Sequence, residues 1–168
     1  MPLPSTMTPI ATQILSSASA SMTFNNIPQT YTDIIIIGKL VEDTAGNNNA
    51  RMRFNSDSAT NYSGTGVTGD GTTASSGRGT NTTGIGVSYG NANSGRVPEF
   101  ILHIMNYANT TTYKTTLGRN GCGASSGWTD ANVNLWRSTS AISTISFHTT
   151  NTNFGVGTMF TLYGVKAA

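Results

Sequence analysis

The chain has 168 residues, of which only 10% are charged, and a formal net charge of +2. The low net charge argues against intrinsic disorder, and the scattered basic residues argue against nucleic-acid binding, which concentrates them on one element. The single cysteine excludes an intrachain disulfide framework, and no apolar run approaches the roughly 20 residues that span a bilayer. We therefore expect one domain, with neither nucleic acid nor a membrane as a partner.

The N-terminal segment Met1–Pro9 contains three prolines. Proline lacks a backbone donor and disfavours helices and central strands. We expect an extended arm over residues 1–9, a first strand near Ile10–Leu15 and a single β-sandwich domain over residues 10–168. Leu3 and Met7 are the apolar side chains of this arm and the candidates for its attachment to a partner. A frayed terminus is the alternative interpretation.

Three segments with strand patterns follow. Ser19–Phe24 alternates apolar and polar residues, as a half-buried strand does. The run Ile34–Ile37 is too apolar for an exposed strand. It predicts a central strand covered by the second sheet on one face and by another subunit on the other, unless a single subunit covers both. Arg51–Phe54 alternates again, with Met52 and Phe54 directed inward.

Residues 55–97 are rich in glycine, serine and threonine. Loops of this length in compact domains are functional or lack a fixed structure. We expect one short strand at Gly84–Tyr89 and otherwise a long loop. Disorder of the glycine-rich part, residues 64–97, is the alternative.

The second half of the chain returns to strand patterns. Glu99–Met105 places three large apolar residues on one face, and Ile101 and Met105 on the other, where they are candidates for burial between subunits. Further strands are predicted at Tyr113–Leu117, Asn132–Trp136, Ala141–Thr149 and Thr158–Lys166. Glycine and β-branched residues interrupt every window that could form a helix. The pattern predicts an all-β fold: an antiparallel two-sheet β-sandwich, jelly-roll-like, with about eight strands.

Few side chains suit catalysis. The chain has two histidines, His103 and His148, and we expect each to face solvent or to be hydrogen-bonded on its strand. A zinc site needs further ligands at close spacing, and Asp57 and Asp70 lack the spacing of an EF-hand calcium loop. Because no acid–base or nucleophilic cluster stands out, we expect no enzymatic activity, no catalytic residues, no metal and no cofactor.

The two tryptophans differ in their setting. Trp136 lies beside Leu135 in a predicted strand, which favours burial. Trp128 lies between glycine and threonine in a predicted loop and is the exposed-loop binding candidate. An exposed aromatic side chain suits a protein contact or stacking on a sugar.

Three stretches in a fixed order carry a family resemblance. They are Ser19–Phe24 leading into Ile27–Ile34, Arg53-Phe54-Asn55 followed by Asn61-Tyr62-Ser63, and the terminal Phe160–Ala167. Together they resemble a β-sandwich structural domain of tailed-bacteriophage virion proteins, especially those of phages that infect aquatic bacteria and cyanobacteria. The resemblance implies a small virion protein or the end of a longer fibre chain, and it carries over no catalytic residue. Residues 64–97 depart most from it.

The resemblance, with a short arm and no upstream shaft, favours a capsid decoration (cement) protein that binds the major capsid protein on the virion surface and stabilises the head. We expect a homotrimer, because sandwich edges and outward apolar residues need covering. The alternatives are a tail-fibre or receptor-binding tip and a carbohydrate-binding β-sandwich module. Only these alternatives make a host surface glycan the partner.

Overall fold

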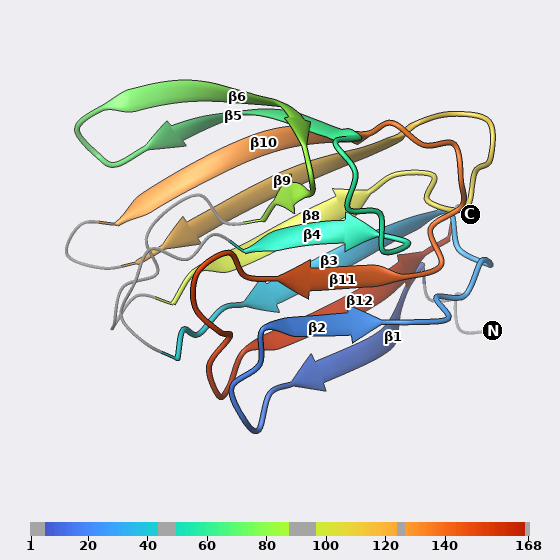
Figure 1. Cartoon of the computed structure of the whole chain (residues 1–168), viewed down its shortest axis with the longest axis horizontal. Coiled ribbons are helices and arrows are strands. Elements are labelled where there is room, and N and C mark those ends of the chain that lie inside the picture. Colours follow the sequence, from blue (N-terminus) through green and yellow to red (C-terminus); the bar gives the residue numbers. More distant parts are fainter. Residues whose placement is uncertain (1–5, 44–49, 88–96, 124–126, 167–168) are drawn as a thin grey trace.

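The computed structural model describes residues 6–43, 50–87, 97–123 and 127–166, and every regular element in these residues is a β-strand (Figure 1). The twelve strands are β1 (Met7–Ile14), β2 (Ser21–Phe24), β3 (Asp33–Lys39), β4 (Arg51–Phe54), β5 (Tyr62–Gly69), β6 (Ala74–Thr82), β7 (Ile85–Gly86), β8 (Glu99–Ile104), β9 (Lys114–Cys122), β10 (Trp128–Trp136), β11 (Ile145–His148) and β12 (Met159–Val165). The described residues therefore form an all-β fold, as predicted.

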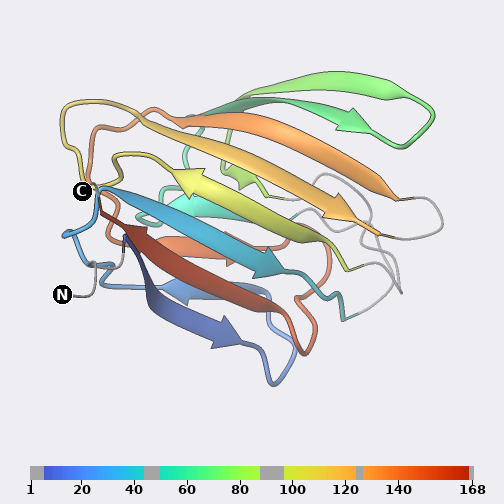
Figure 2. The ribbon, with the colours of Figure 1, turned by 180° about the vertical axis from the view of Figure 1, so that it is seen from behind.

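The strands form two antiparallel sheets that face each other (Figures 1 and 2). The large sheet has the order β1-β12-β3-β8-β9-β10-β5-β6, and the small sheet has the order β2-β11-β4-β7. With β5, β6, β9 and β10 set aside, consecutive strands alternate between the sheets except at β4 and β7, which both lie in the small sheet, and this is the connectivity of a jelly roll. The predicted antiparallel sandwich is confirmed. The strand number is higher than expected because those four strands widen the large sheet.

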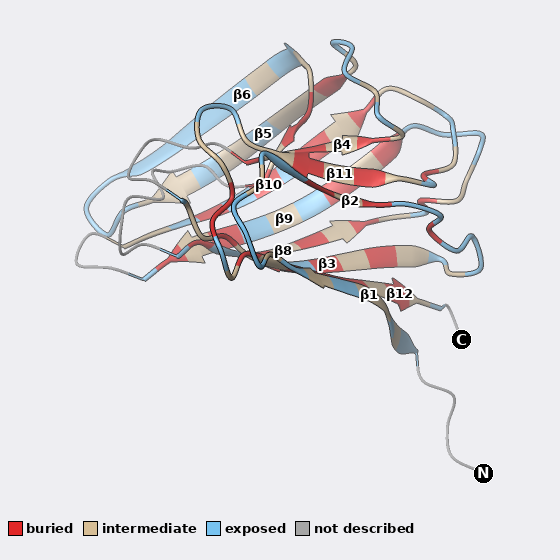
Figure 3. Cartoon of the chain, turned by 60° about the horizontal axis from the view of Figure 1, so that its bottom comes forward, coloured by how far each residue is buried: buried red, intermediate tan, exposed pale blue. Residues whose placement is uncertain are grey.

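The core lies between the two sheets and is filled by inward-facing residues of both. Ile36 of β3 is fully buried, and Phe147 of β11 packs on Phe160 of β12 with ring centroids 4.2 Å apart. Trp136 is buried, as predicted, and donates from Nε1 to Oδ2 of Asp57 at 2.7 Å. Buried positions concentrate on the central strands of both sheets, whereas β6 is exposed along most of its length (Figure 3).

The glycine-rich region differs from the prediction. Residues expected to form a long loop form the β5–β6 hairpin. A Cβ at Gly64 would lie 2.3 Å from Oδ1 of Asn134, so glycine allows the asparagine side chain to lie against β5. The expected strand Gly84–Tyr89 is reduced to Ile85–Gly86, and residues 88–96 lie outside those described.

The N-terminus also differs from the prediction. β1 begins at Met7, whose backbone pairs with Val165 of β12. Pro9 is tolerated because β1 is an edge strand, and the register shifts just after it. The domain therefore begins before Ile10, and Met7 is fixed to the sheet rather than extended away from it. Leu3 lies outside the described residues.

Candidate interaction surface

The outer face of the large sheet, turned away from the small sheet, carries apolar side chains on its central strands. Strand alternation buries Ile36 and directs Ile37 outward. The outward residues Ile37, Leu117, Val133 and Val67 are 37%, 44%, 39% and 58% exposed. An antiparallel sheet with one face in water normally carries polar residues on that face. This face is therefore a candidate contact surface.

Backbone register brings these residues together from five adjacent strands. Ile37 of β3 pairs with Ile101 of β8, and Leu117 of β9 pairs with Val133 of β10. Val67 lies on β5, the strand next to β10. Ile37, Ile101, Leu117, Val133 and Val67 are termed the outer band. Because the band runs across the strands, it joins residues that lie far apart in the sequence.

Of the two residues predicted to lie between subunits, Ile101 is on this face and Met105 lies just beyond the end of the same strand. Ile101 belongs to the outer band and is half-buried. Met105 directly follows β8, is half-buried, and donates from its backbone N–H to the carbonyl oxygen of Thr115 at 3.3 Å. Each keeps accessible surface for a partner. The isoleucine run, expected to be covered on both faces, is covered on its inner face, while Ile37 stays partly open to solvent.

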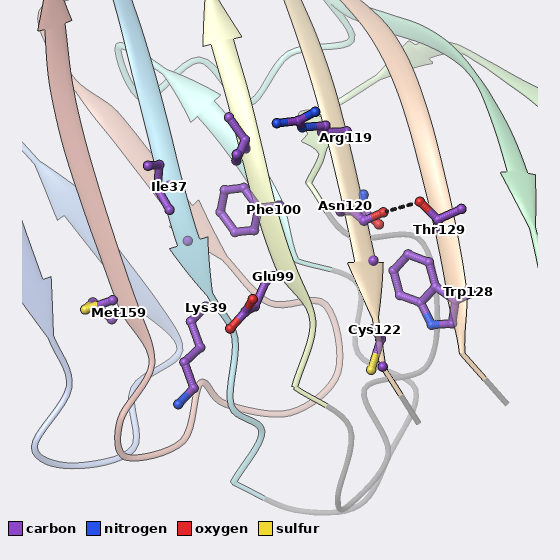
Figure 4. Close-up of a pocket in the computed structure, with 14 residues that line it drawn as sticks. Ile37, Lys39, Glu99, Phe100, Arg119, Asn120, Cys122, Trp128, Thr129 and Met159 are labelled. Atoms are coloured by element: carbon purple, nitrogen blue, oxygen red, sulfur yellow. Dashed lines mark hydrogen bonds between the residues drawn. The ribbon is translucent and has the colours of Figure 1, made fainter. Parts of the chain in front are cut away.

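One end of the outer band opens into a shallow groove of about 670 Å³ (Figure 4). Lys39 pairs with Glu99, and Glu99 pairs with Gly121. Gly121 also pairs with Thr129. In this row, Gly121 therefore lies between Glu99 and Thr129 and carries no side chain. Arg119 lines the groove as well. The groove therefore combines apolar side chains with charges of both signs.

Trp128, the predicted exposed-loop aromatic residue, begins strand β10 instead of lying in a loop. It pairs with Cys122, because β9 and β10 extend beyond the predicted segments. Its side chain is half-buried and lines the groove (Figure 4). Its indole Nε1 is buried and has no hydrogen-bond partner among the residues that the structure describes. Trp128 is therefore part of the groove wall rather than the tip of a loop.

The two histidines lie apart and in different environments. Nε2 of His103 lies 2.8 Å from Oδ2 of Asp33, which confirms a hydrogen-bonded strand histidine. Burial, with the charges of Arg53 and Arg51, lowers the pKa of His148 to about 4, so this side chain is neutral at pH 7. Its Nδ1 is buried without a hydrogen-bond partner in the described part of the chain. Within residues 6–43, 50–87, 97–123 and 127–166, no three His, Cys, Asp or Glu side chains are grouped to hold a metal.

A buried row of polar residues, not predicted from the sequence, lies on the inner face of the large sheet. Nδ2 of Asn134 donates to Oδ1 of Asn132 at 2.8 Å, and Nδ2 of Asn132 donates to Oδ1 of Asp130 at 3.0 Å. Nδ2 of Asn120 donates to the same carboxylate oxygen at 2.8 Å. These four residues are termed the amide ladder. The sequence held a signal for it, because polar residues occupy every second position before the buried Trp136.

Comparison with known proteins gives no assignment, because no family model, no curated protein and no solved structure matches the chain. In the described segments, no helix is long and apolar enough to cross a bilayer. The fold, the outer band with its groove, and the amide ladder are therefore the observations that bear on function.

Proposed function

We propose that the protein is a non-enzymatic structural protein of a bacteriophage virion, and specifically a capsid decoration protein that binds the major capsid protein and stabilises the head. The jelly-roll connectivity supports this proposal, because viral capsid proteins use the same architecture. The observation that carries it is the outer band. Exposed apolar patches of this kind mark sites of protein–protein contact.

The occupant that we assign to the outer band is a second copy of the chain. The adjoining groove carries Lys39, Glu99 and Arg119, so two copies joined by apolar contacts can also pair charges of opposite sign. In a ring of three copies, each outer band meets a different surface of the next copy, so the same contact repeats at each interface and no band is left open. In this homotrimer, Ile101 and Met105 lie between subunits.

Attachment to the capsid is assigned to the N-terminal edge of the large sheet. Met7 is 38% exposed on the edge strand β1, and Ile14 at the other end of that strand is 63% exposed. Leu3 precedes β1 in the sequence and stays a candidate for the same contact. Binding that is selective for the assembled shell stabilises the head by mass action.

Light scattering of the purified chain tests the self-association. The wild type is expected to be a trimer, and Val133→Lys to be a monomer because it places a charge within the outer band. Val156→Lys makes the same substitution at a 62% exposed position outside the strands, so it is the matched control and is expected to stay trimeric. A monodisperse wild-type monomer at micromolar concentration contradicts a preformed trimer.

Cryo-electron microscopy of virions that contain the protein tests its location. Density distributed over the icosahedral head supports a decoration protein, whereas density confined to the tail supports a tail-fibre or receptor-binding tip. Absence of the protein from purified virions refutes the virion proposal as a whole.

A further inference from the structure

A polar cleft of about 290 Å³ lies on the inner face of the large sheet, near its β6 edge. Gly66 of β5 and Gly77 of β6 line it, together with Asp130 and Asn132 of β10. Arg51 of β4 lines it from the small sheet. We propose that this cleft binds a saccharide and holds one or two of its sugar residues. It lies on the face of the sheet opposite to the outer band, and the inference does not depend on a virion location.

The glycine at position 77 points to a ligand rather than to internal packing. A Cβ built on Gly64 would collide with Asn134, so the fold itself requires that glycine. A Cβ built on Gly77 meets no atom of the described residues within 4 Å, and its backbone is not in the left-handed region that favours glycine. Glycine weakens a strand interior and often marks a place where a ligand approaches the backbone closely. The open backbone of Gly77 therefore forms one wall of the cleft.

The amide ladder supplies fixed polar groups to the same cleft. Asp130 and Asn132 are 4% and 7% exposed, and the Asp130 carboxylate accepts hydrogen bonds from Asn120 and Asn132. These bonds hold the carboxylate and the amide in one orientation before a ligand arrives, which limits the entropy lost on binding. Buried polar groups of this kind are uncommon in a sandwich core and fit a site better than a packing role.

The chemistry of the lining identifies the class of ligand. The carboxylate of Asp130 disfavours an anion, and the guanidinium of Arg51 disfavours a cation. Arg78 also borders the cleft. Strand alternation, however, directs its side chain to the outer face of the sheet, where Arg78 borders a second hollow with Thr65 and Val133. Among the described residues, the lining contains glycines, hydroxyls, an amide and charged groups, and no aliphatic or aromatic side chain.

A neutral ligand rich in hydroxyl groups matches this set of donors and acceptors, because a hydroxyl can both donate to Asp130 and accept from Arg51. The volume lies near the lower end of the range for small-molecule sites, about 300–1,000 Å³, which suits one or two sugar rings. A saccharide satisfies both conditions.

The test is binding of the full chain to a glycan array of bacterial and animal oligosaccharides, followed by calorimetric titration of the strongest one. Gly77→Val places a branched side chain in the cleft, with its Cβ in open space, and is expected to abolish binding. Thr80→Val, a nearly isosteric change on the same strand that does not line the cleft, is the matched control and is expected to bind like the wild type. Arg51→Met removes the guanidinium and is expected to weaken binding about tenfold or more.

Thermal unfolding of each variant shows whether it is folded, and Arg51→Met keeps the test decisive if Gly77→Val does not fold. The proposal is overturned if the wild type binds no saccharide on the array, or if the folded cleft variants bind as tightly as the wild type. Loss of binding in Trp128→Ala but not in the cleft variants also overturns it, because the saccharide site would then lie in the groove.

Discussion

The isoleucine run allows the two faces of the large sheet to be tested with one substitution made at adjacent positions. Ile36→Ala removes a side chain that is 0% exposed and whose residue pairs with Leu102 and Leu162 on the neighbouring strands. Ile37→Ala removes the same atoms from the outer band, where the side chain is 37% exposed. Strand, residue type and lost volume are identical, so only the face differs.

The expected magnitudes differ because only one substitution leaves a cavity. Ile36→Ala is expected to lower the free energy of unfolding by about 2–5 kcal/mol. Ile37→Ala is expected to lower it by about 1 kcal/mol in the monomer, since its side chain borders solvent and no enclosed space forms. For a chain of this size, 1 kcal/mol corresponds to about 2–4 °C in Tm, so the two variants separate clearly. Ile37→Ala should in addition weaken the trimer, because each subunit loses apolar contact area.

The assay is denaturant unfolding at a protein concentration low enough for the monomer, combined with light scattering over a concentration series. Monomer conditions matter because subunit association raises apparent stability. Equal losses of stability in the two monomeric variants would refute the assignment of the faces. A trimer whose dissociation is the same in wild type and Ile37→Ala would refute the outer band as the interface.

Three further predictions concern packing, pH and the N-terminus. Gly118→Ala is expected to destabilise the fold by about 1–3 kcal/mol in denaturant unfolding, because its Cβ would lie 2.5 Å from a leucine methyl carbon and 2.6 Å from an asparagine oxygen. Gly123→Ala, whose Cβ would have no atom of the described residues within 4 Å, is the control, and equal stability of the two variants would contradict the packing of the amide ladder. Burial raises the pKa of Asp57, but hydrogen bonds, one of them from Trp136, outweigh it and hold the pKa below its usual 3.8. The ionised carboxylate therefore stabilises the fold fully above about pH 5, and this contribution is lost as the pH falls through the lowered pKa. Asp57→Asn is expected to be less stable than the wild type by about 1 kcal/mol at pH 7, and thermal unfolding across pH should show that difference shrinking in acid. A difference that stays constant across pH would contradict a stabilising role for the ionised carboxylate. Deletion of Met1–Pro9 removes the start of β1 and is expected to lower Tm by a few degrees, leave the sandwich folded and reduce occupancy on capsids, whereas unchanged decoration would exclude the arm from attachment.

The sequence by itself determined the strands whose inward residues are apolar. The alternation in Glu99–Met105 and Arg51–Phe54 predicted β8 and β4 closely, because the strand period of two is a local property of the pleated backbone. The same alternation placed Ile101 and Met105 on the face opposite to the core residues of β8. Because no segment carried a helical pattern, the sequence was also sufficient to predict an all-β fold.

Where strands with little apolar alternation form, and where they begin, could be seen only in the tertiary structure. The β5–β6 hairpin is built mainly from glycine, serine and threonine without apolar alternation, so it gives no local strand signal, and Gly64 is explained only by Asn134 on a strand distant in sequence. The start of β10 at Trp128 follows in the same way from its pairing with Cys122. Such elements depend on contacts between neighbouring strands, which local periodicity does not report.

The tertiary structure also decided both candidate sites. The outer band exists because register pairs Ile37 with Ile101 and Leu117 with Val133, and because the small sheet packs against the inner face and leaves the outer face open. The polar cleft exists because the β5–β6 hairpin joins the same sheet as Asp130 and carries glycine where its strands face inward. Sequence pattern assigns a side chain to a face of its own strand, whereas the choice of neighbouring strands, which sets what each face meets, is made only when the whole sheet assembles.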